Sequence, residues 1–164
     1  MEKPFILVVD DNKITTKLLK RYLETNGYLA GEAYDGVECL EKVEERIPDA
    51  IILDVMMPRM DGYETVKRLK SQEHTKDIPV VIVTALNDVA NQIKSVDAGA
   101  DDFLSKPIEE KLLVAKVRFL SKFSLEMKKN KILLELIQKI KNKEIELNGK
   151  SPEQMLQEEL NKAL

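Results

Sequence analysis

The sequence predicts an α/β fold in which helices cover both faces of a parallel β-sheet. Three short stretches are apolar without interruption, at residues 5–9, 50–53 and 80–83. Such stretches are typical of strands that are buried on both faces, as in a parallel sheet. Amphipathic stretches with helical spacing alternate with them, and parallel strands need helical connections of this kind. The alternation therefore indicates a doubly wound sheet.

Two further strands have weaker patterns, at residues 28–34 and 103–104. Five strands connected by helices suggest the flavodoxin-like strand order 2-1-3-4-5. The connecting helices are predicted from apolar residues at helical spacing and from the turn residues that end each of them. Their ranges are 14–23, 37–47, 63–69 and 89–98.

A fifth helix is predicted to be much longer than the others. No Pro or Gly occurs from Glu109 until Gly149, so we expect a helix of about 40 residues, roughly 60 Å long. After it, Ser151 has the position of an N-cap, Pro152 that of the first helical residue, and Gln154 completes a capping box. We therefore expect a globular domain at 1–120 and a helical extension at 121–164.

The extension carries a pattern typical of a coiled coil. Core positions alternate by three and four residues and include one polar side chain; they are Leu120, Phe123, Met127, Asn130, Leu134 and Ile137. An Asn at such a position can fix the register of paired helices. One interpretation is a long amphipathic helix that packs on its own domain. We favour a helix that continues from the domain and pairs with a second subunit, giving a homodimer.

Composition and charge limit the classes of function. The formal net charge is −3, and the extension carries nine Lys against seven acidic residues. Neither value is the basic excess typical of nucleic-acid binding, so we expect no direct contact with nucleic acid. No stretch approaches the length of about 18 apolar residues that indicates a membrane span. Cys39 is the single cysteine, which agrees with a reducing, cytoplasmic location.

Polar residues follow four of the predicted strands. Asp10 and Asp11 follow the first, Asp54 the third, Thr84 the fourth, and Lys106 comes shortly after the fifth. Ligands of an open parallel sheet bind at the carboxyl ends of its strands. Each residue alone has an ordinary explanation as a helix cap, a strand end or a surface charge. Because four strands deliver polar groups to one edge, a shared site is the better interpretation.

The residue types at this edge suggest phosphoryl chemistry with a metal ion. Three neighbouring carboxylates resist joint ionisation, and a hard divalent cation such as Mg²⁺ relieves their repulsion. We expect Asp11 and Asp54 to bind Mg²⁺ directly, and Asp10 directly or through water. A carboxylate can also attack a phosphoryl group, a reaction that needs positioning and charge neutralisation. Lys106 would neutralise the phosphoryl oxygens and Thr84 would donate a hydrogen bond.

These residues together resemble the receiver domain of two-component response regulators. The matching segments are Val8-Val9-Asp10-Asp11-Asn12, Leu53-Asp54-Val55-Met56-Met57-Pro58-Arg59-Met60-Asp61-Gly62, Val83-Thr84-Ala85 and Lys106-Pro107. The resemblance covers about residues 4–120. An acidic pair alone is a weak signal, whereas the full set in this order and spacing is specific.

The resemblance implies a role for each matching residue. Asp54 would be the phosphoacceptor, Thr84 the switch hydroxyl and Phe103 the switch aromatic, although a phenylalanine on a short strand can also be an ordinary core residue. Lys106 and Pro107 would be joined by a cis peptide bond. The implied Mg²⁺ ligands are Asp10, Asp11, Asp54 and the backbone carbonyl of Met56.

The resemblance also implies a mechanism of signalling. A sensor histidine kinase or a phosphotransfer protein would donate the phosphoryl group. Thr84 would then move towards it, Phe103 would turn inward, and the face formed by 89–98, 103–104 and the fifth helix would change shape. The chain would act on no substrate beyond its own phosphorylation and dephosphorylation. Its long helix would control dimerisation, an output domain or a partner.

The apolar side chains at two positions indicate how long the phosphorylated form would last. Met56 and Leu86 lie two residues after Asp54 and Thr84, and both are apolar. Apolar side chains there would shield an acyl phosphate from water, so we expect slow self-dephosphorylation.

Two rival interpretations remain open at this point. A phosphatase with an Asp nucleophile places its nucleophile and its acid two residues apart after the first strand, whereas here Asp10 and Asp11 are adjacent and Asn12 follows. A receiver-like scaffold that never takes a phosphoryl group usually lacks an acidic residue, the lysine or the acceptor, and this sequence has them all.

Overall fold

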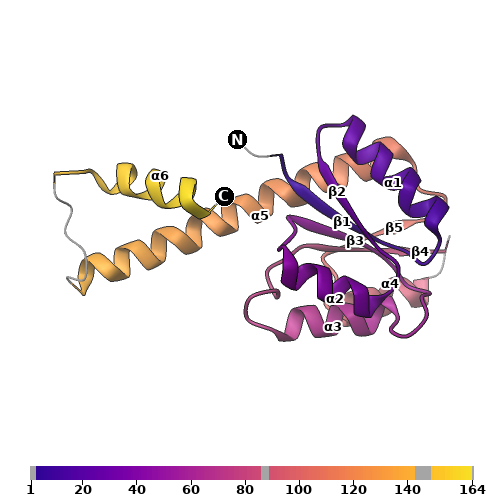
Figure 1. Ribbon diagram of the computed structural model, residues 1–164. Coiled ribbons are helices and arrows are strands. Elements are labelled where there is room, and N and C mark those ends of the chain that lie inside the picture. Colours follow the sequence, from indigo (N-terminus) through magenta and orange to yellow (C-terminus); the bar gives the residue numbers. More distant parts are fainter. Residues whose placement is uncertain (1–2, 86–88, 143–148, 164) are drawn as a thin grey trace. The chain divides into compact units, whose positions relative to one another are not determined.

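The computed structural model describes residues 3–85, 89–142 and 149–163 (Figure 1). The chain divides into two compact units, Lys3–Ser124 and Leu125–Leu164. None of the described helices combines the length and the apolar composition that crossing a membrane requires.

The first unit contains a five-stranded parallel sheet in the order β2-β1-β3-β4-β5, which confirms the predicted order. The strands are β1 (Phe5–Val9), β2 (Leu29–Ala33), β3 (Ala50–Asp54), β4 (Val80–Thr84) and β5 (Asp102–Ser105). All residues of β3 and β4 are buried, as expected of unbroken apolar strands between two layers of helices. The register pairs Asp54 with Val83 and Thr84 with Ser105. The carboxyl ends of the central strands therefore meet at one edge.

Helices cover both faces of this sheet (Figure 1). The helices of the first unit are α1 (Lys13–Thr25), α2 (Gly36–Glu45), α3 (Gly62–Ser71), α4 (Val89–Asp97) and the first part of α5 (Glu110–Lys141). One apolar cluster joins α1 and α5 to one face of the sheet, through residues such as Leu19 and Val117. A second cluster joins α2 and α3 to the opposite face, through residues such as Val43 and Val66. The sheet is therefore doubly wound, as predicted.

The second unit pairs the end of α5 with α6 (Pro152–Ala163). Leu136 of α5 and Leu160 of α6 are both buried. The predicted capping box begins α6: the Ser151 N–H donates to Gln154 Oε1 at 2.8 Å, and the Gln154 N–H donates to Ser151 Oγ at 3.2 Å. Both donors are backbone groups that the helix itself leaves without a partner.

The long helix ends earlier than the prediction of about 40 residues. It spans 32 residues, Glu110–Lys141, and residues 143–148 lie outside the described part of the chain. Ile140 is the last apolar residue of α5 and is partly buried, whereas Lys141 and Asn142 are exposed. Tertiary packing supplies most helical stability in proteins. A sequence without Pro or Gly therefore permits a longer helix but does not require one.

Candidate functional site

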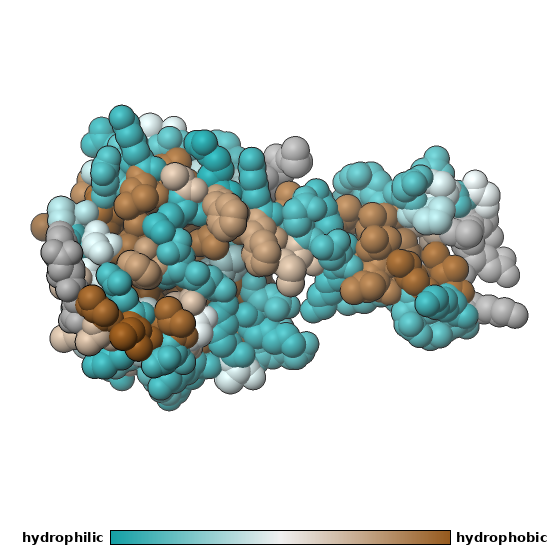
Figure 2. Space-filling view, turned by 180° about the vertical axis from the view of Figure 1, so that it is seen from behind, coloured by the Kyte–Doolittle hydropathy of each residue, from teal (hydrophilic) through white to brown (hydrophobic). Residues whose placement is uncertain are grey.

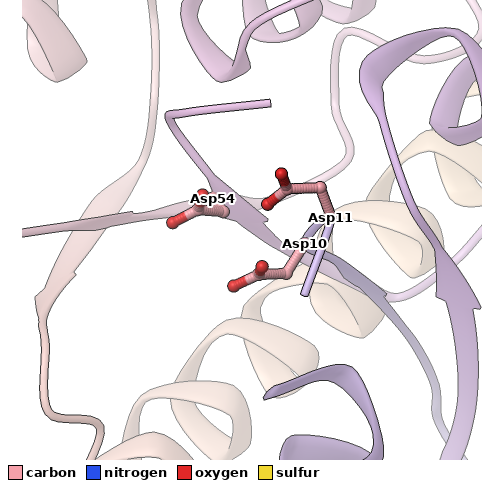
Figure 3. Close-up of side chains that lie close together, drawn as sticks. All are labelled: Asp10, Asp11 and Asp54. Atoms are coloured by element: carbon pink, nitrogen blue, oxygen red, sulfur yellow. The ribbon is translucent and has the colours of Figure 1, made fainter. Parts of the chain in front are cut away.

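Three carboxylates gather at the carboxyl edge of the sheet (Figure 3). They belong to Asp10 and Asp11, which follow β1, and to Asp54, which ends β3. Each offers an oxygen atom, and these oxygens lie within 4.8 Å of one another. Asp10 and Asp54 are 3% and 6% exposed, whereas Asp11 is open to solvent. The arrangement offers a cation a partly buried set of oxygen ligands.

The β1–α1 connection leaves these carboxylates at the site because another residue caps the helix. Asn12 Oδ1 accepts the N–H groups of Ile14 at 2.9 Å and Thr15 at 3.3 Å. Asp10 Oδ1 accepts the Asn12 N–H at 2.8 Å, which orients the Asp10 carboxylate. The alternative that Asp10 or Asp11 serves as the N-cap of α1 is therefore wrong.

Lys106 brings an ammonium group into the acidic cluster. Its Nζ lies 2.7 Å from Asp54 Oδ1 and 3.5 Å from Asp10 Oδ2. The backbone supports this position, since the Lys106 N–H donates to the Thr84 carbonyl at 2.8 Å. The peptide bond between Lys106 and Pro107 is cis. One ammonium thus faces three carboxylates, which leaves an excess of negative charge.

The environment raises the pKa of both partners in the Asp54–Lys106 pair. Burial raises the pKa of the Asp54 carboxyl, the charges of Asp10 and Asp11 raise it further, and the hydrogen bond from Lys106 only partly opposes them. Burial alone would lower the pKa of Lys106, but the hydrogen bond and charge of Asp54, with the charge of Asp10, outweigh it and raise that pKa. Oxygen donors with excess negative charge fit Mg²⁺, whose binding would favour ionised Asp54.

Thr84 and Phe103 lie on the two neighbouring strands. Thr84 ends β4 next to β3, is 3% exposed, and its Oγ1 donates to the Ala85 carbonyl at 3.2 Å. Phe103 is half-buried on β5, and the Nζ of Lys116 lies 6.0 Å from its ring centroid. Phe103 therefore differs from a fully buried core phenylalanine, and its role as a switch stays a prediction.

The loop after Asp54 returns closely to the end of β3. The Gly62 N–H donates to the Val55 carbonyl at 2.9 Å. A Cβ on Gly62 would lie 2.4 Å from the Asp54 carbonyl oxygen, so only glycine fits there without a shift of the backbone. The Met56 side chain is 79% exposed, while Leu86 lies outside the described residues. The predicted shielding by these two side chains stays a prediction.

Sequence reasoning missed a contact that supports this loop. Asp35, at the start of α2, bonds to Arg59 in the loop between β3 and α3. Nothing in the sequence connected Asp35 with a residue 24 positions away.

Comparison with known proteins identifies the family of this chain. The response regulator receiver domain family matches residues 6–118. Response regulator MprA of Mycobacterium ulcerans (strain Agy99) is 45% identical over 115 residues, which are 70% of this chain and 49% of that protein. The chain thus spans about half the length of the curated relatives it matches.

Solved structures agree as well. The receiver domain of Francisella response regulator 1452 has a TM-score of 0.69 and 34% identity, covering 74% of this chain and 99% of that one. The signal receiver domain of a histidine kinase from Syntrophus aciditrophicus has a TM-score of 0.69 and 37% identity, covering 73% and 90%. The family match and the sequence identity together establish that this chain belongs to the receiver domain family of two-component response regulators.

Proposed function

We propose that this chain is a signalling switch in which Asp54 accepts a phosphoryl group from a sensor histidine kinase or a phosphotransfer protein. The observation that carries the proposal is the buried Asp54 carboxylate, held by Lys106 at 2.7 Å and flanked by Asp10 and Asp11. Response regulators as a family are phosphorylated by histidine kinases, and their receiver domains bind Mg²⁺ in an acidic pocket.

The transfer needs little covalent help from the protein. An Asp54 oxygen attacks phosphorus, the bond from phosphorus to the donor's histidine nitrogen breaks, and the imidazole leaves with the electron pair. Lys106, already beside Asp54, neutralises a phosphoryl oxygen, and Thr84 donates a hydrogen bond to another. Mg²⁺, when bound, would neutralise further phosphoryl charge. Its ligands would be Asp10, Asp11, Asp54 and the Met56 carbonyl.

Apolar side chains around the site suggest where the donor protein binds. Ile14 and Leu18 lie one turn apart on α1 and are 79% and 45% exposed, and Met56 is also exposed. Three exposed apolar side chains beside a charged acceptor suit a partner that presents its phosphohistidine from an apolar surface. Small phosphodonors would not need this contact.

Phosphorylation would act on the face formed by α4, β5 and α5. Thr84 would exchange its bond to the Ala85 carbonyl for one to the phosphoryl group, and Phe103 would turn inward. The α4 side of this face carries Val89, Ile93 and Val96, each more than half exposed, and apolar side chains gather visibly on this unit (Figure 2). A face of this kind suits a partner or an output domain.

The extension would form a homodimer through α5. Within the second unit, Leu136 of α5 is buried, while Met127, Leu134 and Ile137 stay 42%, 67% and 38% exposed. These three residues, with Asn130, keep the spacing of a coiled coil. In a parallel pair, exposed Glu126 of one copy would face exposed Lys131 of the other, because these positions flank the apolar seam.

Phosphorylation can be tested directly. Incubation of the intact chain with acetyl phosphate and Mg²⁺ should add the mass of one phosphoryl group, and Asp54→Asn or removal of Mg²⁺ should prevent the addition. Steady release of phosphate from ester substrates without a retained adduct would favour the phosphatase. No adduct at all would favour a scaffold, and an adduct that survives Asp54→Asn would contradict the assignment of the acceptor.

Receiver domains are typically signalling domains rather than enzymes. We accordingly propose that the chain turns over no substrate other than its own acyl phosphate. Response regulators are typically cytoplasmic, and we propose the same compartment for this chain.

A further inference from the structure

The loop between β3 and α3 contains a strained turn. Arg59 has a positive φ of 64°, which side-chain-bearing residues rarely adopt. The Met60 N–H donates to the Pro58 carbonyl at 2.7 Å, so the three residues form a γ-turn with positive φ at its centre. Turns of this hand are rare and strained. Such a conformation persists only where surrounding contacts hold it.

Asp35 supplies the contact that holds this turn. Arg59 Nε donates to Asp35 Oδ2 at 2.8 Å, and Arg59 Nη2 donates to the same oxygen. The other carboxylate oxygen accepts the Glu38 N–H at 2.9 Å, which caps α2. The Asp35 side chain is 9% exposed although Arg59 is largely exposed. A nearly buried carboxylate therefore connects the start of α2 with the turn.

The backbone at the start of α2 also contacts the backbone of the loop between β3 and α3. The Gly36 N–H donates to the Met60 carbonyl at 3.3 Å. A Cβ on Gly36 would lie 2.1 Å from Thr65 Oγ1 and 2.9 Å from the Met60 side chain. The start of α2 thus approaches the turn more closely than any side-chain-bearing residue would allow.

The turn lies next to the proposed metal site. Met56, whose carbonyl we propose as a Mg²⁺ ligand, precedes Arg59 by three residues. Pro58 lies between them, and its ring restricts φ. Movement of Arg59 would therefore reach the Met56 carbonyl along a short and stiff piece of backbone.

We propose that the Asp35–Arg59 pair is a positioning device: it holds the strained turn after β3 and thereby keeps the Met56 carbonyl placed for Mg²⁺ binding and phosphoryl transfer. The inference rests on the proposed function. It assigns Asp35 and Arg59 a role through the backbone, without contact to the ion or the phosphoryl group.

The first test measures Mg²⁺ binding without a phosphodonor. Isothermal titration of the full chain with MgCl₂ should show affinity about tenfold weaker in Arg59→Ala, as is typical when a residue supporting a metal ligand is removed. Asp35→Asn should weaken Mg²⁺ affinity similarly, because it removes the charge that holds Arg59. Asn can still cap α2. The double variant should be no weaker than either single one, since both remove the same contact.

Matched variants separate positioning from folding. Arg68→Ala removes another exposed Arg–carboxylate pair, to Glu64 at 2.9 Å, and should leave Mg²⁺ affinity unchanged. Arg59→Gly relieves the strain of the turn but also removes the contact with Asp35. It should therefore recover thermal stability relative to Arg59→Ala while Mg²⁺ affinity stays weak.

The possible outcomes distinguish a failure of the proposed function from a failure of the positioning role. Wild-type protein that binds no Mg²⁺ and takes no phosphoryl group from acetyl phosphate would overturn the proposed function. Wild-type protein that does both, with Arg59→Ala indistinguishable from it in affinity and phosphorylation rate, would overturn only the positioning role. An Mg²⁺ affinity of Arg59→Gly equal to that of the wild type would also overturn the positioning role.

Discussion

Replacing the phosphoacceptor by its amide, Asp54→Asn, should stabilise the protein when no metal is present. The substitution removes one of three carboxylates whose oxygens lie no more than 4.8 Å apart. Burying one ion costs several kcal/mol in a protein, and this cost together with the charges of Asp10 and Asp11 outweighs the attraction of Lys106, because the pKa of Asp54 is raised. Solvent reduces the contribution of exposed Asp11.

The lost attraction to Lys106 offsets part of this gain. A hydrogen bond to a charged group contributes about 1.5–3 kcal/mol, but the Asn amide oxygen can still accept one worth about 0.5–1.5 kcal/mol. The net expectation is a gain of about 2 kcal/mol in the free energy of unfolding. For a chain of this size that corresponds to a melting temperature about 4–8 °C higher.

The effect has a defined pH dependence. The pKa of Asp54 is raised in the folded protein, so over the range between its ordinary and its raised pKa the folded state holds more protons than the unfolded state. Wild-type stability therefore falls as the pH rises through this range. Asp54→Asn has no carboxyl group there to lose a proton, so it does not show this loss of stability. The difference in the free energy of unfolding between Asp54→Asn and the wild type should therefore grow from acidic to neutral pH.

Thermal unfolding followed by circular dichroism in EDTA measures the difference. Glu41→Gln, which removes an exposed negative charge in the middle of α2, is the matched control and should change little. Mg²⁺ should stabilise the wild type more than Asp54→Asn, which lacks one ligand. An Asp54→Asn variant that melts below the wild type in EDTA at neutral pH would refute the reasoning.

Four further predictions test other parts of the molecule. Gly62→Ala should lower the free energy of unfolding by about 1–3 kcal/mol, because its Cβ would meet the carbonyl oxygen of the phosphoacceptor; urea denaturation measures this loss, and an unchanged midpoint would contradict the close approach. Ile14→Glu should slow phosphorylation by the partner kinase but not by acetyl phosphate, and equal slowing of both would argue against a docking role. Met56→Asn should shorten the lifetime of the phosphorylated form, measured by the decay of the adduct mass, and an unchanged lifetime would contradict shielding. Glu126→Lys should weaken dimerisation in light scattering and the double variant with Lys131→Glu should restore it; a monomeric wild type at high concentration would contradict the dimer.

The strands of this protein were predictable because their signals are local. Unbroken apolar residues at 50–53 and 80–83 are typical of strands buried on both faces of a sheet, and helical spacing between them implies parallel strands. The location of the site followed from the same pattern, since polar residues directly after such strands share one edge. The sequence therefore predicts that Asp54, Thr84 and Lys106 belong to one site.

Other features could not be predicted from local patterns, because neighbouring residues could fill the same role. Asp10, Asp11 and Asn12 all have side chains that can cap a helix, and only the backbone path shows that Asn12 does so. The end of α5 at Lys141 was equally undetermined by the sequence, because no Pro or Gly interrupts the helical pattern before Gly149.

The sequence by itself determined the parallel sheet and the acidic edge, because these follow from the periodicity of side chains within single segments, and the predicted strand order followed from the fold class that five strands connected by helices suggest. Only the tertiary structure decided which groups meet across segments. The contact of Lys106 with Asp54 at 2.7 Å and the contact of Asp35 with Arg59 each connect residues far apart in the chain. The raised pKa of Asp54 depends on such contacts and on burial, because electrostatic energy is set by distances and solvent exposure that no local pattern encodes.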